Sequence, residues 1–88
     1  MARYQGVDTG RLALAEHVAA DQQFFQRGMM CAAGRAAGDL VSAHKWFNLA
    51  AMHGHKQAGV RRVEIAAEMS ESEIAAAQRA ARDWLASH

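Results

Sequence analysis

Proline is absent from this 88-residue chain, and cysteine occurs once, at Cys31. Because proline interrupts helices, its absence leaves the chain free to form long ones. A lone cysteine excludes an intrachain disulfide and therefore excludes a disulfide-framework domain. The chain is also too short for two domains with separate cores, so we expect a single helical domain over residues 1–88.

Excess charge and long apolar segments are lacking as well. The net charge is only +1 with histidine neutral, whereas nucleic-acid readers usually carry a strong basic excess. Polar residues such as Gln5, Asp8 and Arg11 interrupt the N-terminal region, so neither a secretory signal nor a membrane span is predicted. We expect a cytoplasmic protein, with Cys31 reduced, that binds neither a membrane nor nucleic acid.

Alanine is what the sequence has in abundance, at 21 of its 88 residues. Alanine is the best helix former, and the composition is that of a folded globular protein. The sequence therefore predicts an all-α fold of antiparallel helix pairs joined by short connections. After a flexible arm at residues 1–9, about five helices are expected, over residues 10–20, 21–33, 40–53, 56–69 and 71–86.

Capping residues and glycines define the expected helix ends. Asp21 and Asp39 are predicted N-caps, and the segment 70–73 reads S-x-x-E, the pattern of a capping box. Gly34 is expected to end its helix with a left-handed backbone, and Gly54 to end the next helix. Gly28 lies within a predicted helix, which indicates that another helix passes close by.

Apolar periodicity predicts which helix faces point inward. Trp46 and Phe47 are expected to anchor the junction between the second and third helices and the helices that follow. The other expected core positions are Ala43, Ala50 and Ala51 on the third helix; Val63, Ala66 and Ala67, with Val60 and Met69, on the fourth; and Ile74, Ala77, Ala81, Trp84 and Leu85 on the fifth.

One segment resembles a known repeat. Its matching positions are Gly28, Gly34, Asp39, Ala43, Lys45, Trp46, Ala50, Ala51, Gly54 and Ala58. Because of the residues at these positions, the segment 21–58 resembles one Sel1-like repeat, a relative of the tetratricopeptide helix pair. It departs from the family pattern in the interhelix loop, which is one residue shorter and has Ala36 in place of a glycine. Arg27 stands where the family usually has leucine.

The resemblance implies a function as well as a fold. Sel1-like proteins act as scaffolds and adaptors, so a non-enzymatic protein–protein interaction module is expected, with an adaptor or regulator role in proteostasis or stress signalling. A single repeat cannot bury its apolar face alone. We therefore expect capping helices, including the one at 71–86, or a homo-oligomer. By size the chain resembles small single-repeat proteins of alphaproteobacteria, a subset of which regulates an ATP-dependent protease of the Lon type.

The alternative is a small enzyme or metal-binding protein that uses Cys31 and the five histidines. His53 and His55 flank a glycine, and His44 lies earlier on the same predicted helix. A metal site needs three or four convergent ligands, and no H-x-x-x-H or C-x-x-C spacing is present. Cys31 stands where the repeat family has tyrosine, which favours a packing role over a nucleophile. We therefore expect neither a catalytic residue, a cofactor nor a metal.

Two surfaces are candidates for partner binding. The C-terminal tail combines an apolar base at Leu85 with Ser87 and the titratable His88, and its last turn is expected to fray into solvent. On the second helix, Gln26 and Met30 are expected on an open face, because helical repeats bind partners on such faces and methionine adapts to varied shapes.

Overall fold

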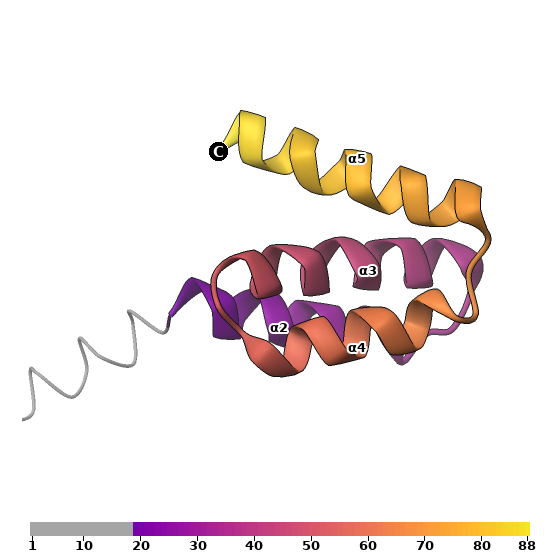
Figure 1. Ribbon diagram of the computed structural model, residues 1–88, viewed down its shortest axis with the longest axis horizontal. Coiled ribbons are helices and arrows are strands. Elements are labelled where there is room, and N and C mark those ends of the chain that lie inside the picture. The colour runs from indigo at the N-terminus through magenta and orange to yellow at the C-terminus, as the bar shows by residue number, and fades with distance from the viewer. Residues whose placement is uncertain (1–18) are drawn as a thin grey trace, which may run out of the picture.

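The computed structural model describes residues 19–88, and these residues form four helices without any strand (Figure 1). The helices are α2 (Ala20–Ala32), α3 (Ala37–Met52), α4 (Lys56–Ala66) and α5 (Glu71–Ser87). The predicted all-α class is therefore confirmed. The predicted arm at 1–9, and all but the end of the predicted helix at 10–20, lie outside the described residues. None of the four helices is long and apolar enough to cross a membrane.

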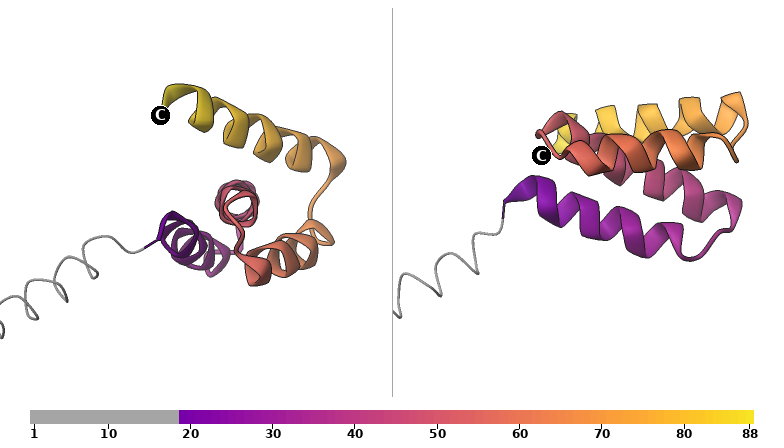
Figure 2. Two further views of the ribbon diagram at one scale, coloured as in Figure 1. Left: turned by 60° about the vertical axis from the view of Figure 1, so that its left-hand side comes forward. Right: turned by 60° about the horizontal axis from the view of Figure 1, so that its bottom comes forward.

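Helix α3 lies at the centre of the arrangement. Consecutive helices reverse direction, and α2, α4 and α5 each pack against α3. Figure 2 shows α2 and α4 together on one side of α3, with α5 on the other. This position explains why α3 has the highest share of apolar residues, since it must bury several faces at once.

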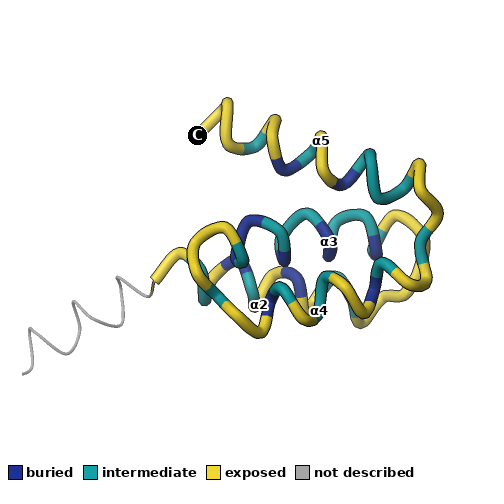
Figure 3. The backbone as a smooth tube through the Cα atoms, viewed as in Figure 1, coloured by how far each residue is buried: buried dark blue, intermediate teal, exposed yellow. Residues whose placement is uncertain are grey.

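The core follows the predicted face of α3. Ala43, Phe47 and Ala50 are completely buried, and so is Leu49, which the periodicity had not singled out (Figure 3). Trp46 is half-buried and packs with Phe24 of α2 at a ring-centroid distance of 5.8 Å. The α3 aromatics thus anchor the neighbouring helices as expected, with Phe47 the more buried of the two.

The face of α4 that points inward differs from the prediction. Val60 and Val63 were expected in the core, yet they are 57% and 66% exposed. Ala58 and Ile65 are buried instead. The two sets lie on opposite sides of the helix, and the short apolar residues of α4 allow either face to be read as the inner one. The prediction was therefore wrong for the two valines, whereas Met69, just after α4, packs partly buried against the core as expected.

Two predicted helix ends are confirmed and two N-caps are wrong. The capping box is present, because Ser70 Oγ accepts a hydrogen bond from the Glu73 amide while Glu73 Oε1 accepts one from the Ser70 amide. Gly54 follows α3 with a φ of 95°. Asp21 and Asp39 lie inside the first turns of α2 and α3, where acidic side chains complement the helix dipole without capping.

The loop between α2 and α3 departs from the prediction at Gly34. The left-handed residue is Arg35, with a φ of 63°, and Gly34 has no positive φ. A side chain at Gly34 would instead collide with the carboxylate of Asp39. Gly34 therefore serves close approach rather than backbone reversal. Because this loop lies beside α4, it places Arg35 at the edge of the site described next.

Candidate partner-binding groove

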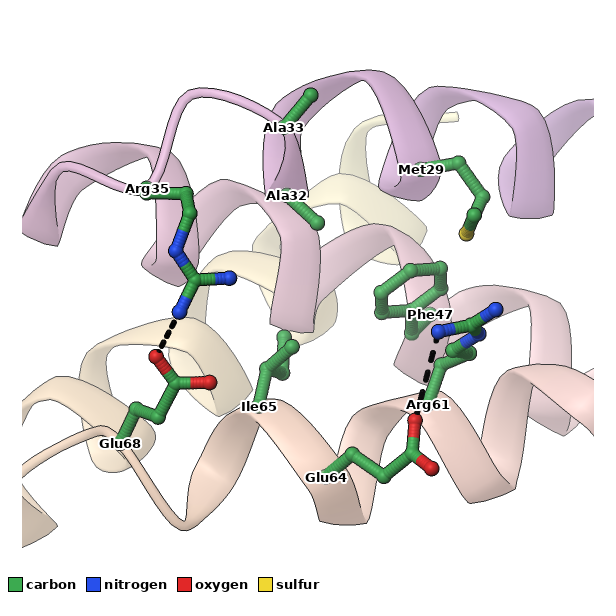
Figure 4. Close-up of a pocket in the computed structure, with 9 residues that line it drawn as sticks. All are labelled: Met29, Ala32, Ala33, Arg35, Phe47, Arg61, Glu64, Ile65 and Glu68. Atoms are coloured by element: carbon green, nitrogen blue, oxygen red, sulfur yellow. Dashed lines mark hydrogen bonds and ion pairs between the residues drawn. The ribbon is translucent and has the colours of Figure 1, made fainter.

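A groove runs between α2 and α4, with α3 beneath it (Figure 4). Its volume is about 320 Å³, enough for one or two large apolar side chains. The groove exists because α2 and α4 pack on the same side of α3. Its lining residues are Met29, Ala32, Ala33, Arg35, Phe47, Arg61, Glu64, Ile65 and Glu68.

The floor of the groove is apolar. Phe47 reaches it from α3, and Figure 4 shows Met29 of α2 and Ile65 of α4 on its two flanks. Phe47 approaches α2 closely because Gly28 has no side chain to keep it away. Met29 is 38% exposed, and its unbranched thioether adapts its shape to what it contacts. Phe47 and Ile65 are themselves buried, so the apolar surface that a side chain from outside can contact is mainly that of Met29, Ala32 and Ala33.

Two ion pairs form the rim of the groove. Arg35 of the α2–α3 loop pairs with Glu68, across the width of the groove. Arg61 pairs with Glu64 one turn along α4, at 3.6 Å. All four side chains are substantially exposed, and exposed pairs contribute at most about 1 kcal/mol. A partner can therefore exchange these pairs for its own charges at little cost.

The predicted open-face residues lie beside this groove but do not line it. Gln26 and Met30 are both exposed on α2, and Met30 is 77% exposed. Met29 lines the groove in their place. Adjacent methionines on one helix cannot both point inward. The sequence does not show which of the two lies beside α4, because that depends on how α2 is rotated against α3.

The predicted C-terminal residues lie at a separate place. Leu85, Ser87 and His88 are exposed, and α5 packs on the side of α3 opposite to α2 and α4 (Figure 2). The last turn is held by side chains. Ser87 Oγ donates to the Asp83 carbonyl at 2.9 Å, and His88 Nδ1 donates to the Trp84 carbonyl at the same distance. The helix thus extends to Ser87, one residue beyond the expected end.

An aromatic cluster fixes that end of α5 to the other helices. Trp84 packs edge-on against Phe24 at 5.1 Å and against Trp46 at 6.0 Å, and the His88 ring stacks on Trp84 at 4.2 Å. Trp84 therefore closes the core, as predicted for Trp84 or Leu85. His88 is exposed, and its ring lies flat on one face of the Trp84 indole.

The residues of the metal and enzyme alternative are dispersed. Within residues 19–88, no three histidine, cysteine or acidic side chains come together as a metal site. Cys31 is half-buried against the core. His53 Nδ1 donates to the Leu49 carbonyl at 2.8 Å. His55 stacks on Phe25 at 4.2 Å, and its Nδ1 accepts the Ala58 amide as the N-cap of α4.

His44 is the exception among these histidines, because it is buried. His44 is only 3% exposed, and its Nδ1 has no hydrogen-bond partner within the described residues 19–88. Burial lowers the pKa of His44 below its usual 6.5, and the nearby positive charge of Arg62 lowers it further. The burial of His44 could have been predicted from the sequence, since His44 lies one turn after Leu40 and one turn before Phe47 on the inner face of α3.

We expect His44 to make the fold less stable in acid. Its pKa is lower in the folded chain than in the unfolded chain, so the unfolded chain takes up the proton first as the pH falls. Stability is therefore fully present above about pH 6.5 and is lost as the pH falls through 6.5 toward the lowered value. Urea unfolding at pH 7.5 and pH 5.0 measures the loss.

The matched variant for this measurement is His44→Leu, which keeps every other histidine. The free energy of unfolding of His44→Leu is expected to fall less between the two pH values than that of the unaltered chain. Equal losses in the two proteins would show that His44 does not contribute to the acid sensitivity.

Comparison with known proteins adds no relative. The chain matches no family model, no curated protein and no solved structure.

Proposed function

We propose that this chain is a non-enzymatic protein–protein interaction module, and that the groove between α2 and α4 is its docking surface. The observation that carries the proposal is the combination of an apolar floor with a rim of exchangeable ion pairs. Protein interfaces commonly have an apolar centre and a polar rim, with methionine and arginine enriched. The helical-repeat resemblance of residues 21–58 also supports this function.

The partner chemistry follows from the shape of the groove. It is flanked by two helices and crossed at one end by the exposed Arg35–Glu68 pair, which suits an amphipathic helix that inserts one or two large apolar side chains beside that pair. Charged residues one turn to either side of such an anchor would reach Arg35 and Glu68 at one end, and Arg61 and Glu64 at the other.

The test uses the charge substitution Met29→Glu, which places a carboxylate over the groove floor. Met30→Glu is the matched control, because it adds the same charge at the next residue, outside the groove. Immobilised protein is incubated with an extract of cells that express it, and the retained proteins are compared. We expect a partner that the unaltered chain and Met30→Glu retain and that Met29→Glu loses.

Equal retention by the two variants would show that the groove is not the docking surface. Loss by Met30→Glu alone would instead place the contact on the outer face of α2, around Gln26. Circular dichroism checks that both variants keep their helix content.

The more specific proposal is a role as adaptor or regulator of an ATP-dependent protease of the Lon type, in proteostasis or stress signalling. It is supported by the small size of the chain, its all-helical make-up and the exposed C-terminal residues Leu85, Ser87 and His88. Proteases that unfold their substrates engage accessible chain ends, and here the exposed His88 ring stacks on Trp84.

A purified Lon-type protease tests this role directly. The degradation rate of a fluorescently labelled unfolded substrate is measured with the unaltered chain, with His88 deleted, and with Met29→Glu. We expect the unaltered chain to change the rate and the His88 deletion to reduce that change. The protease role would be contradicted if the unaltered chain neither changed the degradation rate nor bound the protease at about 100 µM. The test of the groove with cell extract does not depend on this result.

A further inference from the structure

The outer face of α4 carries two exposed valines and is covered by no other helix of residues 19–88. Helix α4 contacts the core through Ala58 and Ile65, which are buried. At 100° per residue, the opposite face carries Lys56, Val60, Val63 and Ala67, with Gly59 at its edge. We call these five residues the outer stripe; its two valines are 57% and 66% exposed.

This face is bare because of where α5 packs. In a stack of helical repeats, neighbouring helices pack against one another. Packing of α5 against α4 would therefore be the usual arrangement. Here α5 crosses to α3, so α3 is the one described helix against which α4 packs extensively (Figure 2). The outer stripe lies away from α3, from α5 and from the floor of the groove.

Nothing within residues 19–88 explains why residue 59 is a glycine. A β-carbon added there would meet nothing within 4 Å, and its backbone is not left-handed. Glycine is nevertheless among the poorest helix formers, and alanine would suit this position better. A glycine on a helix surface permits the close approach of another helix, and the approach here must come from outside residues 19–88.

The charges of α4 select the direction of that approaching helix. Lys56 lies at the start of α4 and has no carboxylate partner among residues 19–88. Glu64 lies near the end of α4 and Glu68 just beyond it, and both make exposed ion pairs at the groove rim. A second copy of α4 in antiparallel orientation would bring Lys56 of each chain beside the acidic end of the other, with Val60 opposite Val63. A parallel copy would bring like charges together.

We propose that the outer stripe is a two-fold homodimer interface, in which α4 pairs with α4 of a second copy in antiparallel orientation. A two-fold interface must be self-complementary. Here the two valines would face each other across the axis, and Lys56 at one end of the stripe would lie beside Glu64, next to the stripe of the other copy. Helix α4 has 11 residues and is about 16 Å long. A stable interface buries roughly 800 Å² on each partner. A helix of this length is too short to bury that area alone, so the dimer is expected only at high protein concentration.

Sedimentation velocity of the full chain between about 5 and 500 µM tests the proposal. The weight-average mass is expected to rise from the 9.6 kDa of one chain toward twice that value. A mass that stays at that of one chain up to 500 µM would overturn the proposal.

Substitutions test whether the outer stripe is the surface through which the chain dimerises. Val63→Lys should keep the chain monomeric at 500 µM, and Gly59→Leu should weaken dimerisation at least tenfold. The matched controls are Met30→Lys, at another highly exposed apolar residue, and Gly38→Leu, at another glycine with open space. Dimerisation that survives Val63→Lys, or that Met30→Lys abolishes equally, would overturn the assignment to the outer stripe.

A charge exchange tests the antiparallel orientation. Lys56→Glu should weaken the dimer, and the double variant Lys56→Glu/Glu64→Lys should restore it, because the complementary charges are then interchanged. Failure of the double variant to recover any dimer would contradict the antiparallel arrangement. Circular dichroism of each variant confirms that a loss of dimer is not a loss of helix.

Discussion

Replacement of Phe47 by alanine is expected to lower the free energy of unfolding by about 3–5 kcal/mol. Phe47 is completely buried at the centre of α3, and its ring contacts Phe25 of α2 at a centroid distance of 5.7 Å. Truncation would leave a cavity between α2, α3 and α4, where the rigid helix backbones cannot collapse to fill it. An 88-residue chain has a total stability on the order of 4–13 kcal/mol.

Urea unfolding followed by circular dichroism measures this effect through the shift of the midpoint. Val63→Ala is the control, because it also shortens an apolar side chain but at a site that is 66% exposed. Its effect should stay within about 0.5 kcal/mol. If Phe47→Ala shifted the midpoint no more than Val63→Ala does, the central position of Phe47 in the core would be wrong.

The sequence predicted the core of α3 well for a physical reason. Ala43, Phe47 and Ala50 recur at helical spacing on a helix surrounded on three sides, so burial and periodicity agree. The capping box at Ser70 and Glu73 was equally predictable, because its hydrogen bonds are local.

The incorrect predictions concern features that depend on contacts between segments far apart in the sequence. Helix α4 carries small and β-branched residues on both faces, and the side that points inward depends on how α4 meets α3. Gly34 has the residue type of a left-handed cap, but Arg35 takes that conformation, and its guanidinium pairs with Glu68, 33 residues away. Sequence periodicity contains no information about such a pairing.

The candidate groove illustrates the same limit. Its existence requires α2 and α4 to lie on one side of α3 while α5 crosses to the other. The sequence predicted a partner surface on α2 and named Gln26 and Met30, which are exposed. Residues of α4 and the interhelix loop complete the groove, and only the arrangement of the helices brings them beside Met29.

Substitution of Gly28 by alanine is expected to destabilise the fold by about 1–3 kcal/mol, although alanine is the better helix former. A β-carbon at Gly28 would lie 2.5 Å from two ring atoms of Phe47. That ring is completely buried, so a β-carbon at Gly28 would force the ring to shift from its packed position. The steric overlap therefore outweighs the gain in helix propensity, which is about 1 kcal/mol.

Gly38→Ala is the control for this prediction, because a β-carbon there meets nothing within 4 Å. It should leave the stability unchanged or raise it by up to about 1 kcal/mol. The cause of the Gly28→Ala effect is tested by adding Phe47→Leu, which removes part of the ring. Because the two residues contact each other, the double variant should be more stable than the sum of the single effects predicts, by about 0.5–3 kcal/mol. A Gly28→Ala variant as stable as Gly38→Ala, or strict additivity with Phe47→Leu, would show that close packing of α2 on Phe47 does not require glycine.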